Sequence, residues 1–214
     1  MLTNIYLLTL LISFLCSLIS FRLHYPFHLK FFSVLIGIAA VTEFVAFYGP
    51  KIWNFTNNMP VYNVYHLFEF CGTALFFKYL INNQGIQKII NAFLIGYPVF
   101  WVVSIFSLNG IGAWNSNLAV VGAVFMIVLS SAYCYKLFVS DELISFRTCS
   151  EVWIAVALII YYSTMLPITG LFYYLTEHFK VLANQLIDLL QVANILMYSL
   201  FIYAYLCRGL ITRK

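Results

Sequence analysis

Seven long apolar blocks, separated by short polar connections, constrain this chain more than any other feature of its sequence. A helix that crosses a membrane needs about 20 apolar residues, and each block is close to that length. The blocks are Ile5–Phe21, Phe31–Gly49, Val61–Ile81, Ile89–Leu108, Leu118–Val139, Val152–Leu175 and Leu189–Ile211. They leave no connection long enough for a soluble domain. We therefore predict an all-α fold, a single polytopic transmembrane bundle of seven helices over residues 1–214.

The composition excludes the main soluble classes. The chain is 64% apolar and 8% charged, whereas an ordinary soluble domain is about 45–50% apolar and about 25% charged. Strands of a membrane barrel alternate apolar and polar residues, and runs such as Leu118–Met126 do not alternate. The net charge of +4 comes from basic residues scattered between the blocks, so no basic patch indicates nucleic acid as a partner. The partner that the composition predicts is the lipid bilayer.

Helix-breaking residues fall between the blocks. Gly49-Pro50 and Asn109-Gly110 disfavour a continuous helix, and so do the polar runs Asn57–Pro60 and Asn82–Gly85. The first block has no basic residue ahead of it and no small-residue cleavage site after it, so we expect it to be retained rather than removed as a signal peptide. Tyr and Trp residues at block ends, Trp114 among them, are interpreted as an aromatic belt.

The distribution of basic residues predicts the orientation of the bundle. With seven spans, the connections after the first, third and fifth blocks lie on the same side of the membrane as the C-terminus. That side carries nine of the eleven Lys and Arg residues, and the other side carries only Lys51 and Lys180. Because cytoplasmic loops are enriched in Lys and Arg, we predict that the N-terminus is outside and the C-terminus is cytoplasmic.

Three ionisable residues lie well inside the apolar blocks: Glu43, His66 and Glu69. At the helical rise per residue, Glu43 lies about 9 Å below the outer boundary, His66 about 8 Å and Glu69 about 12 Å. We expect all three in the outer half of the membrane, and no comparable ionisable cluster in the inner half. Ionisable groups at such depth are costly and indicate function. We expect the two carboxyl groups to share a proton or to pair with His66.

Polar residues on the third and seventh blocks extend this cluster. Tyr62, His66 and Glu69 follow one helical stripe, and Gln191 and Asn194 lie at about the depth of Glu43 on the last block. The sequence predicts a polar ligand-binding pocket that opens to the outside, formed by Glu43, Tyr62, His66, Glu69, Gln191 and Asn194. The alternative is a polar clamp that locks the helices together and binds no ligand.

Sequence signals for metals, cofactors and catalysis are weak. His66 and Glu69 invert the Glu-x-x-His order of di-iron bundles, and the motif occurs once. His24 and His28 flank Pro26 beyond the first block, which favours an interfacial loop over a metal site. The five cysteines are odd in number and show no C-x-x-C spacing. We predict no catalytic residue, no metal and no cofactor.

The arrangement of Glu43, Tyr62-Asn63-x-x-His66-x-x-Glu69-Phe70 and Gln191-x-x-Asn194 resembles that of a group of small, mostly uncharacterised bacterial seven-helix membrane proteins. It is more distantly similar to the seven-helix input regions of some sensor kinases. The resemblance covers most of the chain. It implies extracytoplasmic sensing or small-ligand binding by a multi-pass protein of the cell inner (plasma) membrane. Thr212–Lys214 carries no output domain, so we expect a separate cytoplasmic or membrane protein to read the signal through short loops such as Ser140–Ser150.

The leading functional hypothesis is a ligand-responsive signalling or accessory module that takes a small polar ligand from the outer side. One alternative is an intramembrane lipid hydrolase or transferase, in which Glu43 or Glu69 is the general base and a metal assists. Further alternatives are an oligomeric pore whose polar stripes face the axis of a homo-oligomer, a phage-defence accessory protein and a proton-coupled transporter.

Overall fold

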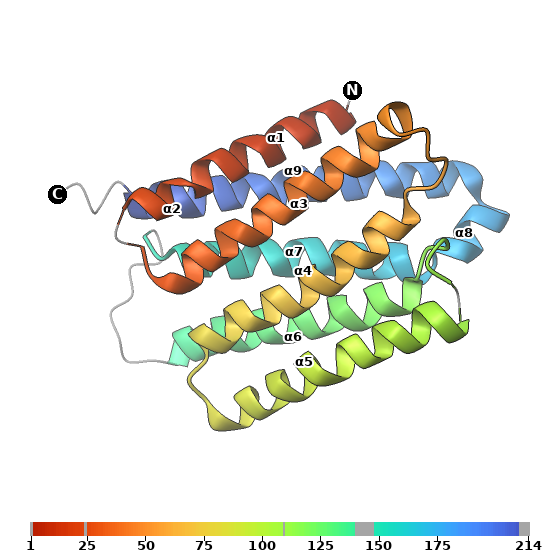
Figure 1. Cartoon of the computed structure of the whole chain (residues 1–214). Coiled ribbons are helices and arrows are strands. Elements are labelled where there is room, and N and C mark those ends of the chain that lie inside the picture. Colours follow the sequence, from red (N-terminus) through yellow and green to blue (C-terminus); the bar gives the residue numbers. More distant parts are fainter. Residues whose placement is uncertain (1, 24, 109, 140–147, 210–214) are drawn as a thin grey trace.

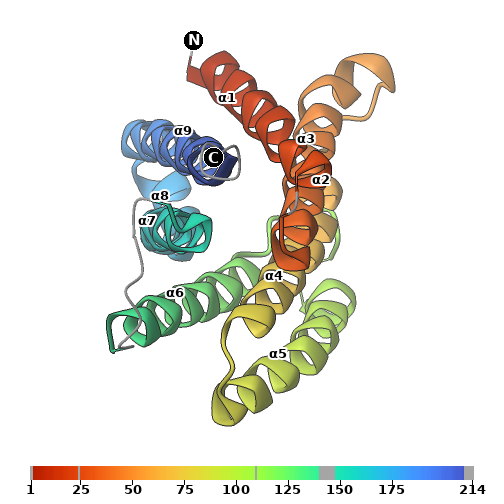
Figure 2. The same ribbon diagram turned by 90° about the vertical axis from the view of Figure 1, so that its left-hand side faces the viewer.

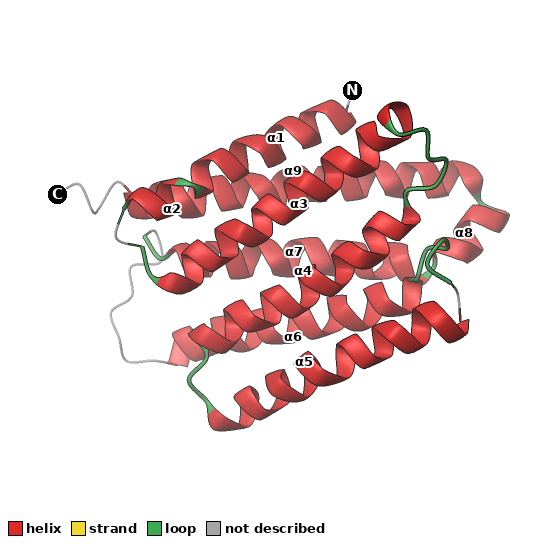
Figure 3. Ribbon diagram, viewed as in Figure 1, coloured by secondary structure: helices red, strands yellow, loops and turns green. Residues whose placement is uncertain are grey.

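The computed structural model describes residues 2–23, 25–108, 110–139 and 148–209, and within these ranges the chain is helical with no strand (Figure 3). Long helices alternate in direction along the bundle, so that α1 begins and α9 ends at opposite ends of it (Figure 1). They are α1 Leu2–Ser17, α3 Phe27–Ile52, α4 Met59–Leu80, α5 Gln84–Val103, α6 Ser116–Val139, α7 Ser150–Gly170 and α9 Lys180–Gly209. Short elements are α2 Ile19–Arg22, the π-helix η1 Ser104–Leu108 and α8 Phe172–His178. The predicted all-α fold is confirmed for the described residues.

Six helical segments in the described chain are long and apolar enough to cross a membrane, which fits a multi-pass membrane protein. They are Leu2–Arg22, Phe27–Ile52, Gln84–Ser107, Ser116–Val139, Ser150–Gly170 and Lys180–Arg208. The helix α4 is not among them, although it has 22 residues. Its polar residues, Asn63, His66 and Glu69 among them, lower its mean hydropathy. The seventh span and the orientation stay predictions.

The helices form a ring rather than a flat layer. Going round it, α1 packs on α3, α3 on α4, α4 on α6, α6 on α7, α7 on α9, and α9 returns to α1. The remaining long helix, α5, packs on α4 outside the ring, as the end-on view shows (Figure 2). One face of α4 is therefore turned to the interior of the ring, where lipid does not reach it.

Aromatic side chains fill much of the ring's interior. The Phe32 ring lies 4.7 Å from that of Phe76 and 5.1 Å from that of Phe201, measured between centroids. On α6, a Cβ at Gly122 would overlap the Phe70 ring, so glycine is what allows α4 and α6 to approach here. Large buried side chains such as these stabilise a bundle mainly through close packing, because lipid supplies no hydrophobic driving force between helices.

Several predicted helix boundaries are wrong. The helix α3 continues through Gly49-Pro50 to Ile52. Proline leaves the Ala46 carbonyl without its helical donor, and the side-chain Nδ2 of Asn58 lies 3.5 Å from that oxygen. Proline in the last turn is thereby tolerated.

The last two blocks also differ from their predicted limits. The block Val152–Leu175 is divided, because α7 ends at Gly170 and α8 follows. The helix α9 begins at Lys180 rather than at Leu189, since the intervening Leu, Ala and Gln residues favour helix without being uniformly apolar. The predicted end of that block, Ile211, lies outside the described residues, as does the C-terminal Thr212–Lys214.

A buried ion-pair cluster lies where α3 and α7 begin and α9 ends. The Glu151 side chain is 9% exposed, and its Oε1 lies 2.9 Å from His28 Nε2 and 2.8 Å from Arg208 Nη1. This cluster is not predicted from the sequence, and His28 belongs to α3 rather than to a loop. The sequence gives no signal for this cluster, because Glu151 directly precedes an apolar block and is therefore predicted to lie in a connection. His24 and most of Ser140–Ser150 lie outside the described residues.

Candidate functional site

A cavity of about 300 Å³ lies among α1, α3, α4, α7 and α9, near the end of the bundle where α1 begins. Its lining runs from Thr3 and Asn58, near that end, to Glu69. It is lined by all six residues that the sequence predicts to bind a ligand, namely Glu43, Tyr62, His66, Glu69, Gln191 and Asn194. Their role in binding stays a prediction, but the polar side chains of three separate helices share one space.

Helical periodicity brings these side chains together. On α4, residues three and four positions apart project from one face, so Tyr62, His66 and Glu69 line the cavity together. Gln191 and Asn194 do the same on α9, which runs in the same direction as α4 (Figure 1). Glu43 reaches the cavity from α3, Thr3 and Tyr6 line it from α1, and Tyr161 and Met165 line it from α7.

Glu69 is held by two donors. His66 Nδ1 lies 3.1 Å from Glu69 Oε2, and the Tyr162 hydroxyl donates to Glu69 Oε1 over 3.0 Å. The His66 and Glu69 side chains are 6% and 13% exposed. Of the two arrangements that the sequence left open for Glu69, the structure has the pair with His66. The residue Tyr162 was not singled out, because a lone tyrosine in an apolar block gives no signal that distinguishes a donor from a packing residue.

Glu43 has a different set of partners. The Tyr62 hydroxyl donates to Glu43 Oε2 over 3.2 Å, and the Tyr6 hydroxyl is a second hydrogen-bond partner of the same carboxyl group. Glu43 therefore does not pair with His66. Among the residues of the described chain that line the cavity there is no Lys or Arg. Hydroxyl groups, rather than a fixed cation, face this carboxyl group.

The second ring nitrogen of His66 is buried without a partner. His66 is 5% exposed, and within the described residues its Nε2 has no hydrogen-bond partner. The His66 ring stacks on Phe70 at 5.5 Å and meets the edge of Trp114 at 5.3 Å, between centroids. Buried polar groups are almost always satisfied by protein, water or ligand. This unused Nε2 atom thus belongs to a side chain that lines the cavity.

A short connection between η1 and α6 places Trp114 beside His66. The buried Asn63 side chain donates to the carbonyls of Ile111 and Ala113, both over 2.8 Å, and Trp101 Nε1 donates to the Asn63 carbonyl over 2.7 Å. The two bonds from the Asn63 side chain tie the connection to α4, and the Trp101 bond ties α5 to α4. The interpretation of Trp114 as part of an aromatic belt is therefore wrong, because this side chain lines the cavity.

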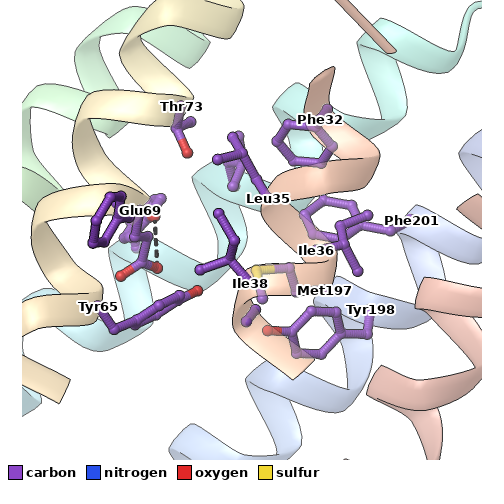
Figure 4. Close-up of a pocket in the computed structure, with 14 residues that line it drawn as sticks. Phe32, Leu35, Ile36, Ile38, Tyr65, Glu69, Thr73, Met197, Tyr198 and Phe201 are labelled. Atoms are coloured by element: carbon purple, nitrogen blue, oxygen red, sulfur yellow. Dashed lines mark hydrogen bonds between the residues drawn. The ribbon is translucent and has the colours of Figure 1, made fainter. Parts of the chain in front are cut away.

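A smaller cavity of about 40 Å³ continues deeper into the ring (Figure 4). Tyr65 and Glu69 line both cavities. In Figure 4 these two side chains face Ile38, Met197 and Tyr198, which come from α3 and α9. A space of this size holds about one water molecule. Glu69 therefore stands between the larger cavity and an almost entirely apolar interior.

Metal ligation finds no support in the described part of the chain, where no group of three or more His, Cys, Asp or Glu side chains is placed to hold an ion. No protein-family model, curated protein or solved structure matches this sequence. The chemistry of the cavity is what remains to indicate a function.

Proposed function

We propose that this chain is a multi-pass protein of the bacterial inner membrane that binds a small polar ligand in the 300 Å³ cavity and signals through a separate protein. The observation that carries the proposal is the cavity itself. Glu43 from α3 and Glu69 from α4 line the same space as His66, whose buried Nε2 has no hydrogen-bond partner in the described residues. A clamp that only locked helices together would be expected to consume its polar atoms in contacts between helices.

The proposed topology has seven spans. The helix α4 is the seventh span, although its mean hydropathy is too low for it to count as a candidate span. Its position supports this, because α4 packs against α3, α5 and α6 and so presents little of its polar face to lipid. The alternation of helix direction also places the start of α1 and the end of α9 at opposite ends of the bundle (Figure 1). With the basic residues in the cytoplasm, the cavity then lies on the outer side.

The helix α9 is the proposed route from the ligand to the partner protein. It contributes Gln191 and Asn194 to the cavity and reaches Arg208 at the opposite end, where the ion pair with Glu151 ties it to α7. A ligand that shifts α9 at the cavity would shift this pair as well, because a packed helix moves as a unit. The cytoplasmic ends of α7 and α9 are therefore the proposed contact region for the partner.

Side-specific labelling of a cysteine tests this proposal. In a variant whose five native cysteines are replaced by serine, Gln191→Cys places a thiol in the cavity. Val192→Cys is the matched control, because Val192 is the next residue of α9, is 48% exposed and does not line the cavity. The probes are water-soluble, membrane-impermeant methanethiosulfonates added to intact cells.

We expect both a cationic and an anionic reagent to label Gln191→Cys from outside, although at different rates, and neither to label Val192→Cys, because hydrocarbon excludes water-soluble reagents. Equal labelling of the two thiols, or no labelling of Gln191→Cys, would overturn the proposed cavity. Labelling of Gln191→Cys only in inverted vesicles would overturn the proposed orientation.

A further inference from the structure

The fixed charges that face the cavity are unbalanced. Glu43 and Glu69 face it with His66 as the one basic side chain among the described lining residues. With both carboxyl groups ionised, a protonated His66, whose Nδ1 contacts Glu69, balances Glu69 and leaves Glu43, whereas a neutral His66 leaves both carboxylates. In either state the negative charges outnumber the positive ones. An occupant that restores the balance is a cation.

The surroundings of Glu43 support a mobile cation rather than a fixed one. Tyr62 and Tyr6 hydrogen-bond this carboxyl group, which stabilises a carboxylate without neutralising it. A buried carboxylate is costly unless it is both hydrogen-bonded and paired with a charge. Glu43 has the hydrogen bonds that a carboxylate needs. It has no Lys or Arg partner among the described lining residues.

The walls of the cavity distinguish an organic cation from a metal ion. Six aromatic side chains line it: Tyr6, Phe47, Tyr62, Tyr65, Trp114 and Tyr161. The faces of aromatic rings attract ammonium groups and are the usual means of recognising them. A hard metal ion would instead need several oxygen ligands converging on one point, and within the described residues no acidic and histidine side chains converge in that way.

The unpartnered nitrogen of His66 indicates which kind of organic ammonium ion the cavity would bind. The hydrogen-bonding roles of the two ring nitrogens are linked, and when Nδ1–H donates to Glu69 in a neutral ring, Nε2 is an acceptor. A buried acceptor without a partner calls for an N–H or O–H donor. A primary or secondary ammonium has such a donor, and a quaternary ammonium has none.

We infer that the ligand of this cavity is a compact organic ammonium ion, whose charge lies against Glu43 and the aromatic walls and whose N–H reaches His66 Nε2. The inference rests on the proposed function and specifies the ligand class for the same site. A volume of about 300 Å³ corresponds to about ten water molecules at their share of liquid volume. It therefore suits a small amine rather than a lipid or a peptide.

Charge-selective labelling tests the sign of the ligand. On the Gln191→Cys background we compare the rates of a trimethylammonium-bearing and a sulfonate-bearing methanethiosulfonate, each divided by its rate with a free thiol. A cavity lined by one sign of charge concentrates the opposite ion, so we expect the cationic reagent to be favoured by about tenfold or more. Glu43→Gln should bring the ratio close to one. Asp188→Asn is the matched control and should leave the ratio unchanged, because Asp188 is an exposed acid of α9 that does not line the cavity.

Protection from labelling tests the chemical class. The probes are n-propylammonium, n-propanol and propionate, which share a carbon chain and differ in charge, together with tetramethylammonium. We expect n-propylammonium to slow labelling of Gln191→Cys, tetramethylammonium to protect less well, and the alcohol and the carboxylate not to protect. Fluorescence of Trp114 gives a second readout, because a change on binding should be lost in Trp114→Phe.

The outcomes separate the inference from the proposed function. Equal rates for the two reagents, or equal protection by propanol or propionate, would overturn the ammonium class while the labelled cavity remained. Absence of labelling at Gln191→Cys would overturn the cavity and the inference together.

Discussion

The two ends of this bundle bury acidic side chains in different ways. At one end Glu151 accepts a hydrogen bond from Arg208 over 2.8 Å and contacts His28 at 2.9 Å, so a cation of the chain itself balances its charge. At the other end the hydrogen-bond partners of Glu43 among the described residues are tyrosine hydroxyls, next to a cavity of about 300 Å³. The charge of Glu151 is thus balanced within the chain, whereas Glu43 has no cation beside it among the described residues and borders an open cavity.

Neighbouring residues repeat this contrast. Beside Glu151, the Ser33 hydroxyl bridges Ser20 and Tyr205 at 2.9 Å each, and the Tyr25 hydroxyl donates to the Tyr205 carbonyl over 2.6 Å. Beside Glu43, the buried His66 Nε2 has no partner among the described residues. A network in which each member is bonded rigidifies a structure, whereas a buried polar atom without a protein partner is usually satisfied by water or a ligand. The comparison teaches that cost alone does not identify a site, since Glu151 is also buried and fixes the fold.

The largest expected effect is that of Glu151→Gln. Removing one partner of a buried pair leaves the other charge uncompensated, and we expect a loss of about 3 kcal/mol, at the lower end of the usual range because the Arg208 side chain is 32% exposed. Thermal unfolding in mild detergent measures this loss. Glu43→Gln in the same assay should cost less than about 1 kcal/mol, because cavity water can replace the lost contacts. Equal losses would remove the contrast between the two ends.

Asn63→Ala should have the next largest effect. It removes the two hydrogen bonds that the Asn63 side chain donates to the connection carrying Trp114, to the Ile111 and Ala113 carbonyls, at a cost of about 2 kcal/mol. We expect the emission of Trp114 to shift, as measured in a variant that keeps this tryptophan alone. Asn57→Ala is the control, because Asn57 is exposed and donates to Gly112 over 2.6 Å in the same connection. A larger shift in the control would contradict the role given to Asn63.

Tyr62 and Tyr162, which donate to Glu43 and Glu69, should also differ in how much the loss of the hydroxyl destabilises the fold. Tyr162 is 1% exposed and donates to Glu69, so Tyr162→Phe leaves a carboxyl oxygen without its protein donor and should cost about 1 kcal/mol. Tyr62 is half-buried at the cavity, where water replaces its hydroxyl, so Tyr62→Phe should cost less. Chemical unfolding of both variants checks the order, and the reverse order would indicate that Glu43 lies in a dry site.

The smallest effect concerns the thiol of Cys149, which directly precedes α7. Burial and the negative charge of Glu151, whose Oε2 lies 3.4 Å from the sulfur, raise the pKa of Cys149 above its ordinary value. A raised thiol pKa means less thiolate at neutral pH, so alkylation of a variant with Cys149 alone should reach half its maximal rate at higher pH than a free thiol. Glu151→Gln should lower that midpoint. An unchanged midpoint would contradict an ionised Glu151 at this position.

The helical fold was largely predictable, because apolar length and helix-breaking residues are local properties. Hydropathy failed as a signal where polar residues are buried inside the protein. The helix α4 is polar on a face that the ring covers, and Glu151 sits at a helix start that hydropathy assigns to a loop.

The site was predictable only through its ionisable residues. Glu43, His66 and Glu69 are conspicuous in apolar blocks, whereas Tyr6 and Tyr162 are two of sixteen tyrosines and carry no distinguishing signal. Trp114 could not be placed from sequence either, because its position depends on hydrogen bonds between Asn63 and a connection about fifty residues further along the chain. Such long-range contacts have no local pattern.

The most direct measurement is a crystal structure of the full chain grown with 3-bromopropylammonium, in which bromine marks the ligand by anomalous scattering. We predict one strong peak inside the cavity, with the ammonium beside Glu43 and His66 and both carboxyl groups turned toward it. Density in which Glu43 and Glu69 point apart into lipid, or in which side chains fill the space between them, would contradict the account.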